Sequence, residues 1–458
     1  MSKAPTTPAR RIPACPTSAA LPRARRYSGS PGAAYNDSAF VPADTRTFVM
    51  TAEDGSLAAH PSFVLQTANG MVLTGDSFGD GEGRGWASAF DDASAKLKWA
   101  WQSNSKEMDA ILGAATLADG TVVLGGTRSV RGRWELLLVA LHPENGTEKW
   151  ATTLSPASPH HGDCAQTSAA NCFGTIFWLD ADPVRQVMIL GGVVDFPGDA
   201  GQILWKSGGG QPDAGGVPFI AAIPFAKLAS ATAPTVGAIA TAHYFDPAPG
   251  FTTVVSLRAE HGTGVVALLP LNPAGGSVAH FSYEDGASGQ LRLDWMTALS
   301  VNHQITDVAV VGAANASSKG CRGYVVSSTV NPGAVIEALT PEGKSAWTHT
   351  FDIKDQFPAE SKRNWCQECW SIAARGDQVM LSCGVAELPP GDLNCDDGLW
   401  RSLLVSFDFR RPADDAAVSY RVFGEDGNFA VEYASFGGDG EVLCAIDADP
   451  ATIIRFEA

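Results

Sequence analysis

One short stretch of the chain carries the side chains that a calcium ion prefers. Asp392, Asn394, Asp396 and Asp397 lie together in DLNCDDG. Alternating carboxylate and amide oxygens beside a glycine resemble a calcium-binding loop, although the glycine falls one place late and no glutamate closes the loop. Calcium is therefore the candidate cofactor of this stretch, and an ordinary Asx-rich turn is the alternative.

Histidine and cysteine side chains offer ligands for transition metals. His160 and His161 are adjacent, but adjacent side chains on an extended segment diverge, which favours a solvated pair over a metal site. Cys366 and Cys369 form a single CxxC in NWCQECW. One CxxC without a second one is weak evidence for zinc, and no strand-then-helix pattern typical of a thioredoxin-like motif surrounds it.

Disulfide bonds are a better explanation for most of the nine cysteines. Cys164 and Cys172 bracket one polar segment, and Cys383 and Cys395 bracket another, so the spacing predicts two local disulfides that hold these loops. Disulfides favour an oxidising, extracytoplasmic or secreted setting. No apolar run follows the Arg-Arg pairs near the N-terminus, which conflicts with conventional secretion and leaves an organelle lumen, reached through a transit-like tail, as the alternative.

A catalytic nucleophile is not indicated by any motif. Ser77 stands in GDSFG, which matches the Gly-x-Ser-x-Gly pattern, but a glycine-rich segment follows where a nucleophile elbow requires a helix. The sequence also contains no His-Glu-x-x-His, phosphate loop or dinucleotide-binding fingerprint. The prediction therefore leans toward a protein that is not an enzyme.

The elements that must position these residues are short strands. Three segments share one plan, in which a strand ends at an alanine, a turn follows, and a second strand is centred on Trp99, Trp150 or Trp347. This plan predicts a hairpin. Further two-strand units such as GAATLADGTVVLGG precede the hairpins. Predicted equivalent positions on the second strands are Val72, Val122, Met188, Val254, Val308, Val379 and Val442.

Seven units of four strands predict an all-β fold, a seven-bladed β-propeller of antiparallel blades, with an open solenoid or stacked sandwiches as the alternative. The segment from Arg46 to Glu53 has no partner of its own, and the last unit stops one strand short. We therefore expect the N- and C-terminal strands to pair near Ile453 to Phe456 and to close the ring. Residues 1–45 are predicted to be a disordered basic tail and residues 46–458 a single propeller domain.

The hairpins also carry a family resemblance. The pattern Ala-x-[Asp, His or Thr]-x-x-x-Gly-x-x-x-Trp around the three tryptophans resembles the tryptophan-docking repeat of quinoprotein-like (pyrroloquinoline-quinone-type) propellers. The resemblance implies a structural tryptophan that packs between adjacent blades, in a superfamily where many members are scaffolds without a cofactor. Its dehydrogenases typically have eight blades and a vicinal cysteine pair, whereas this chain has no Cys-Cys, so a quinone-dependent enzyme is not indicated.

Loop lengths indicate which face of the propeller is functional. The turns between strands one and two and between strands three and four are tight, whereas the other connections are long and gather on the opposite face. Acidic residues predicted on that rim are Asp76, Asp80, Glu82, Asp195, Asp199, Asp213, Asp392, Asp396 and Asp397. Trp86, Trp134, Tyr324 and Trp400 recur near the start of the third strand, where they either pack in the core or stack on a ligand at the rim.

Charge limits the choice of partner. Seven of the 32 basic residues but only two of the 49 acidic residues fall in residues 1–46, which leaves 25 against 47 and a formal charge of −22 on the rest. Such a surface repels nucleic acid and anionic lipid. No segment is long and apolar enough to span a bilayer. The sequence therefore predicts a propeller scaffold, a monomer or a part of a larger assembly, that binds a protein or glycan on its acidic rim. A metal-dependent propeller enzyme with its site in the axial funnel is the alternative.

Overall fold

The computed structural model describes most of the chain after residue 45. The described ranges are 46–49, 59–68, 70–79, 82–91, 96–103, 109–130, 133–154, 172–197, 216–230, 232–235, 238–246, 250–271, 274–284, 289–312, 323–329, 333–352, 364–388, 399–412, 418–427, 430–437, 441–447 and 452–457. Within these ranges the chain forms strands β1 to β28 and one four-residue helix, α2 (Phe225–Leu228). The described residues contain no long helix, as the sequence pattern leads one to expect.

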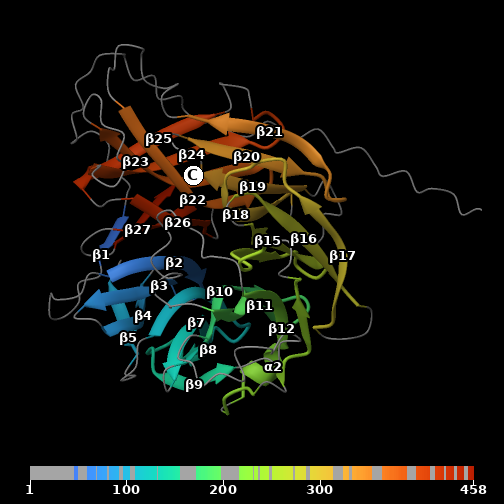
Figure 1. Ribbon diagram of the computed structural model, residues 1–458. Coiled ribbons are helices and arrows are strands. Elements are labelled where there is room, and N and C mark those ends of the chain that lie inside the picture. Colours follow the sequence, from blue (N-terminus) through green and yellow to red (C-terminus); the bar gives the residue numbers. More distant parts are fainter. Residues whose placement is uncertain are drawn as a thin grey trace, which may run out of the picture.

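The strands form seven antiparallel blades arranged in a ring (Figure 1). Blade 1 is β2 (Ala59–Thr67), β3 (Gly70–Gly79), β4 (Glu82–Phe90) and β5 (Leu97–Gln102). Blade 2 is β6 (Asp109–Thr116), β7 (Val122–Val130), β8 (Arg133–Leu141) and β9 (Glu148–Leu154). Blade 3 is β10 (Cys172–Asp182), β11 (Val187–Pro197), β12 (Val217–Pro224) and β13 (Thr241–Tyr244).

The second half of the chain repeats this order. Blade 4 is β14 (Ser256–Ala259), β15 (Gly264–Pro270), β16 (Gly276–Tyr283) and β17 (Leu291–Ala298). Blade 5 is β18 (Gln304–Val311), β19 (Gly323–Thr329), β20 (Ala334–Leu339) and β21 (Ser345–Phe351). Blade 6 is β22 (Asn364–Arg375), β23 (Gln378–Leu388), β24 (Leu399–Asp408) and β25 (Ser419–Gly427). Blade 7 is β26 (Ala430–Phe436), β27 (Glu441–Asp447), β28 (Thr452–Glu457) and β1 (Arg46–Val49). The predicted seven-bladed β-propeller is confirmed.

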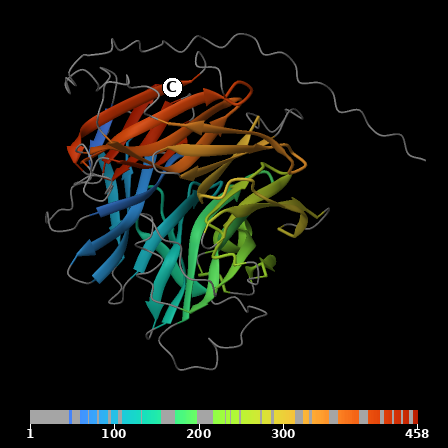
Figure 2. The ribbon, with the colours of Figure 1, turned by 45° about the horizontal axis from the view of Figure 1, so that its top comes forward.

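The two ends of the chain close the ring in blade 7. Strand β1 pairs antiparallel with β28, so that Arg46 stands opposite Arg455 and Phe48 opposite Ile453. The blue strand β1 lies beside the red C-terminal strands in both ribbon views (Figures 1 and 2). The predicted pairing of the termini is therefore confirmed, and it gives the last blade the fourth strand that the C-terminal segment lacks.

Burial follows the position of a strand within its blade. All six residues of β20 are buried, whereas β17, an outer strand, buries only its first residue. Inner strands are covered on both sides because each blade is packed between two neighbours. This explains two errors in the predicted repeat. Val254 lies two residues before β14 and Val308 lies in β18, so neither is on a second strand, although both are buried as the second-strand positions are.

The three predicted tryptophans occupy equivalent positions. Trp99, Trp150 and Trp347 each stand opposite an alanine that is the last residue but one of the third strand of their blade, and a register shift follows that alanine in every case. The Trp99 ring lies so close to Gly146 in the next blade that a Cβ there would come within 2.5 Å of it. Gly146 also has a φ of +67°, which glycine tolerates best.

Each tryptophan contacts the following blade. The Trp99 indole donates a hydrogen bond to the Pro143 carbonyl at 2.9 Å, and the Trp150 indole donates one to the Leu228 carbonyl at 3.2 Å. The Trp347 ring lies 5.6 Å from the ring of Phe409. Trp99 and Trp150 are buried, and Trp347 is half-buried. The packing role that the family resemblance implies is confirmed.

Candidate functional site

The innermost strands of the blades share an irregularity at the same level along the propeller axis. In six of them one extra residue interrupts the register with the second strand. Blade 4 is similar, because Ser256 stands opposite Leu268 while the Val255 N–H also donates to the Leu268 carbonyl, at 3.1 Å. Such bulges re-aim side chains and are common beside functional sites. We call the seven residues at this level the axial ring: Ser62, Leu112, Phe177, Val255, Thr306, Trp370 and Glu432.

The axial ring is more exposed than the residues on either side of it. Six of its members are half-buried, while the residue before and the residue after each of them is buried. The exception is Thr306, which is buried and whose hydroxyl lies 2.8 Å from the Ser327 hydroxyl. A side chain on an innermost strand faces either a neighbouring blade or the axis. Partial exposure between buried neighbours therefore places the ring on the axis.

The residues that follow the ring fill the axis. We call them the plug layer: Phe63, Gly113, Trp178, Ser256, Asp307, Ser371 and Tyr433. The Phe63 and Tyr433 rings stack at 4.1 Å between centroids, and Trp178 meets them edge-on at 5.1 and 5.7 Å. Gly113 lacks a side chain because an added Cβ would stand 3.2 Å from the Trp178 Cα.

An ion pair completes the plug layer. Arg258, two residues after Ser256, donates through one guanidinium nitrogen to both Asp307 oxygens at 3.0 and 2.9 Å, and it lies 4.2 Å above the Trp178 ring. Asp307 also accepts from the Ile372 N–H at 2.9 Å. Burial alone would lower the pKa of Arg258, but the carboxylate of Asp307 outweighs it and raises the pKa above its ordinary value. Blades 4, 5 and 6 are thereby joined at the axis.

Strand direction decides which face the ring points toward. Every innermost strand runs from the connection with the previous blade to the link that leads into the second strand, and this link is short in six blades but spans residues 312–322 in blade 5. The ring precedes the plug layer by one residue, so it lies on the side of the connections between blades and between strands two and three, here called the connection face. The prediction that all these connections are long is wrong for blades 1 and 2, where two residues join β3 to β4 and β7 to β8. Arg258 follows the plug layer and lies toward the opposite side, the turn face. The axial ring is therefore the floor of the connection face.

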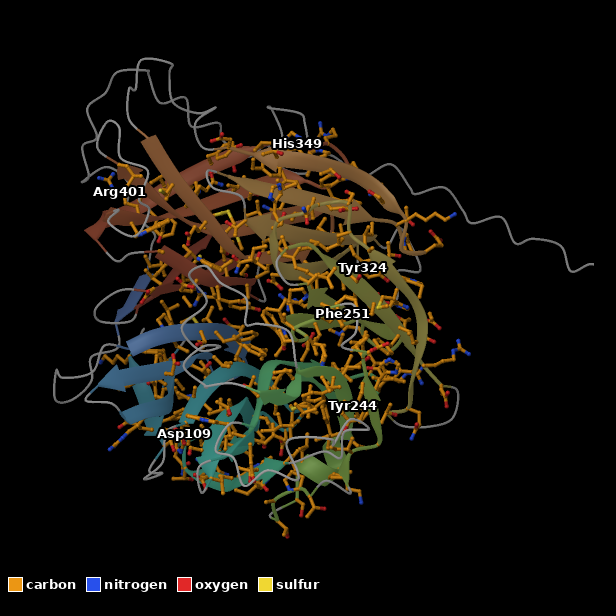
Figure 3. The ribbon with its side chains drawn as sticks, viewed as in Figure 1. Asp109, Tyr244, Phe251, Tyr324, His349 and Arg401 are labelled. Atoms are coloured by element: carbon orange, nitrogen blue, oxygen red, sulfur yellow. A yellow bond between two sulfur atoms is a disulfide. The ribbon has the colours of Figure 1, made fainter. Side chains whose placement is uncertain are left out.

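The predicted rim aromatics separate into two pairs. Trp86 and Tyr324 are buried, so core packing is the correct alternative for both. Tyr324, labelled in Figure 3, is also the second residue of β19, the second strand of blade 5, and does not lie on a third strand. Its hydroxyl donates to Glu260 at 2.5 Å. Trp134 and Trp400 are half-buried at the connection ends of β8 and β24. Trp134 pairs with Phe173 of blade 3, and a Cβ on Gly384 would stand 2.8 Å from the Trp400 ring.

The predicted acidic rim is described only in part. Asp76 is buried near the connection end of β3, opposite Gly85. Glu82 begins β4, but its side chain and the whole of Asp80 lie outside the described residues. Asp392, Asn394, Asp396 and Asp397 also lie outside them, so the calcium loop stays a prediction. Among the residues that the structure does describe, no group of three His, Cys, Asp or Glu side chains has the geometry of a metal site.

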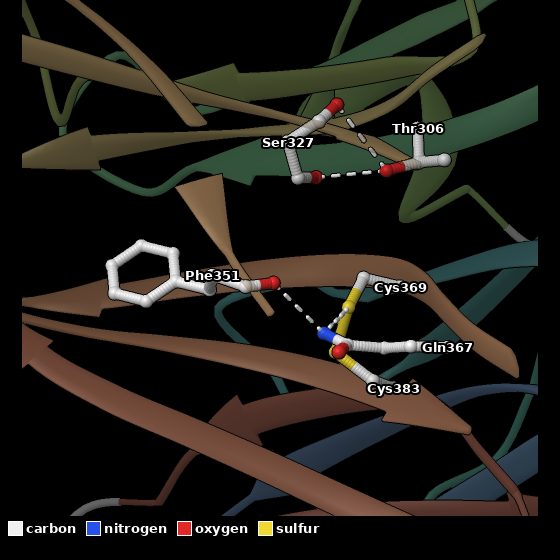
Figure 4. The surroundings of a disulfide bond; sticks show 6 residues. All are labelled: Thr306, Ser327, Phe351, Gln367, Cys369 and Cys383. Atoms are coloured by element: carbon white, nitrogen blue, oxygen red, sulfur yellow. Dashed lines mark hydrogen bonds between the residues drawn. A yellow bond between two sulfur atoms is a disulfide. The ribbon is translucent and has the colours of Figure 1, made fainter. Parts of the chain in front are cut away.

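One disulfide differs from the prediction. Cys383 is bonded to Cys369, which stands directly opposite on β22 with its Cα 3.9 Å away (Figure 4). The predicted bond from Cys383 to Cys395 is therefore wrong, because the Cys383 side chain faces its cross-strand neighbour within the blade. Cys366 is disulfide-bonded as well. Cys164 and the side chain of Cys172 lie outside the described residues, so that bond stays a prediction. Gln367 donates to the Phe351 carbonyl at 3.3 Å beside the bond.

Several buried carboxylates join blades and were not predicted. Asp109, where the blue and cyan strands meet in Figure 3, accepts from the Gly85 N–H of blade 1 at 2.8 Å and from Arg128 at 2.9 Å. Asp182 accepts from the Gly262 N–H of blade 4 at 2.6 Å. Glu337 accepts from the Ser300 N–H at 2.7 Å. Isolated acidic residues inside apolar strands were the available signal, since buried carboxylates require such donors.

A hydrogen-bonded chain crosses from blade 4 to blade 5 near the turn face. His280 lies between two carboxylates, with Nδ1 3.1 Å from Asp294 and Nε2 3.4 Å from Glu260, and Glu260 accepts the Tyr324 hydroxyl. Burial alone would raise the pKa of Asp294, but hydrogen bonds from Ser282 and Arg292 and the charge of His280 hold it below the usual value. The His280 ring stacks on Trp295 at 5.4 Å. Trp295 is a fourth docking tryptophan, since a Cβ on Gly343 would stand 2.6 Å from its ring.

Comparison with known proteins identifies no family for this chain. No family model matches the chain, and no curated protein matches it. Drosophila Semaphorin 1a, extracellular domains 1–2, is 10% identical, with 88% of this chain and 86% of that chain covered and a TM-score of 0.44. Chaetomium thermophilum Sqt1, bound to the N-terminus of ribosomal protein L10, is 10% identical over 90% of this chain and 100% of that chain, with a TM-score of 0.44. Quinohemoprotein alcohol dehydrogenase from Comamonas testosteroni is 12% identical over 83% and 66%, with a TM-score of 0.40.

These likenesses extend no further than the fold. At these TM-scores the likenesses carry no argument, and the assignment of the propeller rests on the strand pairing of the seven blades. Within the described residues, no helix has the length and apolar character needed to cross a membrane.

Proposed function

We propose that the protein is a non-catalytic β-propeller binding module that presents its connection face to a protein or glycan partner. The observation that carries this proposal is the axial ring, a set of half-buried side chains, one from almost every blade, on a filled and rigid floor. Preorganised surfaces of this kind favour binding because little ordering is required when a partner docks.

The use of the polar side chains supports the same proposal. Asp109, Asp182, Asp307 and Glu337 each accept backbone or side-chain donors from another blade. These carboxylates act as structural links between blades. The acidic residues of the connections, by contrast, are at other positions in the sequence. We propose that they give the connection face a negative charge.

The disulfides support an oxidising compartment. Cys369 and Cys383 are bonded within a blade, and Cys366 is bonded too. We therefore infer an extracytoplasmic or secreted setting, or an organelle lumen. Peptide mapping of the purified protein under non-reducing conditions tests this: a bonded Cys369–Cys383 pair is the expected result, and free thiols at both positions would overturn the inference.

The binding proposal is tested with matched charge variants. One variant neutralises connection residues (Asp80→Asn, Glu82→Gln, Asp392→Asn, Asp396→Asn, Asp397→Asn), and the control neutralises turn-face residues (Asp119→Asn, Glu144→Gln, Glu148→Gln, Glu284→Gln, Glu342→Gln). Both are applied to arrays of peptides and of oligosaccharides. We expect the first variant to weaken binding by roughly tenfold, about 1.4 kcal/mol, while the control changes little. Equal effects on the two faces, or no array binding, would overturn the proposal.

Elemental analysis separates the proposal from a metal enzyme. A binding module requires no stoichiometric transition metal, and calcium would mark the DLNCDDG stretch. A stoichiometric transition metal that is lost together with a measured turnover after chelation would instead establish the metal-dependent enzyme.

A further inference from the structure

The axial ring has a composition that selects a particular kind of partner. Four of its seven members are apolar, namely Leu112, Phe177, Val255 and Trp370, and its one ionisable member is Glu432. Half-buried apolar side chains on a rigid floor gain free energy when a ligand removes them from water, at about 25 cal/mol per Å² of apolar surface. The ring therefore suits an apolar group that enters along the axis.

The floor beneath the ring limits how far such a group can enter. Phe63, Trp178 and Tyr433 are in mutual ring contact in the next layer, and Arg258 is paired with Asp307 beside them. A ligand is thus stopped at the plug layer and cannot pass through to the turn face. A single side chain of a peptide fits these limits better than a long chain threaded through the propeller.

Charge complementarity decides what should flank that side chain. The chain beyond residue 46 carries 25 basic and 47 acidic residues, a formal charge of −22. A field of this sign attracts cationic segments and repels anionic ones.

We propose that the axial ring binds a peptide segment of a partner protein in which an aromatic or branched aliphatic side chain is flanked by Lys or Arg. The apolar side chain contacts Leu112, Phe177, Val255 and Trp370, and the flanking cations are attracted by the net negative charge of the chain beyond residue 46. This inference rests on the proposed function, because it names the partner chemistry of the same face.

Methyl NMR provides the test, because the chain contains a matched internal control. Leu112 and Val255 lie in the ring, while Leu97 and Val184 are exposed at 51% and 57% beside tight turns on the turn face. The probe is the capped peptide Ala-Lys-Phe-Lys-Ala added to protein labelled at Leu and Val methyl groups. Peptides with Glu for Lys, or with Ala for Phe, serve as chemical controls, and cellotetraose represents the glycan.

We expect saturable shifts of the Leu112 and Val255 methyl groups with the Lys-Phe-Lys peptide and binding weaker by roughly tenfold or more with either control peptide. Ser62→Trp, which places a large side chain in the ring, should abolish the shifts, while Val184→Ser should leave them unchanged. Thermal melting confirms that both variants fold. If Ser62→Trp does not fold, Leu112→Gln replaces it and should weaken peptide binding.

Four results would overturn the inference: no shift at Leu112 and Val255, equal shifts at Leu97 and Val184, equal binding of the Glu peptide, or ring shifts produced only by cellotetraose. Its failure can be distinguished from failure of the proposed function. If the ring methyl groups do not respond while connection-face charge variants still weaken array binding, only the inference fails. If neither responds, both fail.

Discussion

The axial ring and the plug layer are one residue apart in every innermost strand, yet they differ in what they contact. Trp370 in the ring is half-buried, whereas Trp178 in the plug layer is 9% exposed and packs against Phe63 and Tyr433. The bulge causes the difference, because the extra residue turns one side chain toward the connection face and returns the next one to the packed axis. A single irregularity repeated around the ring thus separates the proposed binding surface from the packed layer beneath it.

The two tryptophans provide the strongest test of this comparison. Trp178→Ala should reduce the free energy of unfolding by about 3 to 5 kcal/mol, since a large aromatic side chain is removed from a filled site. Trp370→Ala should cost about 1 kcal/mol, because the side chain is already partly in water. Urea denaturation of both variants measures the difference. Equal losses would show that the ring and the plug layer are one continuous core.

The ion pair between Arg258 and Asp307 gives a second test of the difference between the plug layer and the axial ring. Asp307→Asn leaves the Arg258 guanidinium without its carboxylate in a largely buried position, so a loss of about 3 kcal/mol is expected. The double variant Arg258→Met/Asp307→Leu should recover most of it, because it removes both charges together. The matched control is Glu432→Gln in the ring, which should change the free energy of unfolding by less than about 1 kcal/mol. A small loss in the free energy of unfolding for Asp307→Asn would mean that water reaches the plug layer.

The pairing of β1 with β28 closes the propeller and so supports both the axial ring and the plug layer. Removing this pairing should have a smaller effect on stability than the substitutions above. Deletion of residues 1–53 removes β1 and leaves β28 as the outer strand of blade 7, paired only with β27. Because β1 lies at the outside of blade 7, far from the axis, the melting temperature should fall by about 2 to 8 °C without loss of the folded state. Deletion of residues 1–45 is the control and should leave the melting temperature unchanged. An identical melting temperature for both truncations would show that the terminal strand does not stabilise closure.

Much of the fold could be predicted because the hairpins repeat in the sequence. The alanine-turn-tryptophan plan located Trp99, Trp150 and Trp347, and the orphan strand at Arg46 located the closure. Trp295 was missed because His280, not alanine, stands opposite it. The hairpin repeat can be recognised in the sequence wherever the contact between blades requires a side chain of the same size.

The axial ring could not be predicted, because a bulge adds one residue without any marked change in composition. The error at Cys383 has the same origin. Without the bulge at Trp370, that tryptophan would stand opposite Cys383, and Cys369 would be out of reach. The correct disulfide therefore depends on a register that sequence spacing does not reveal. The same applies to the buried carboxylates, whose donors come from other blades.

The smallest expected effect lies farthest from the axis, at Asp294 near the turn face. Hydrogen bonds from Ser282 and Arg292 and the charge of His280 outweigh burial and hold the pKa of Asp294 below its ordinary value. A carboxyl group with a lowered pKa in the folded state stabilises that state fully above the pKa of the unfolded state, about 3.9, and loses this contribution as the pH falls through the folded-state pKa. The difference in unfolding free energy between the wild type and Asp294→Asn should therefore be constant above about pH 5 and should shrink below about pH 4. Glu144→Gln, an exposed change on the same face, is the control and should show no such trend. A difference that does not depend on pH would mean that Asp294 acts only as a hydrogen-bond acceptor. The negative charge of its carboxylate would then not contribute to the free energy of unfolding.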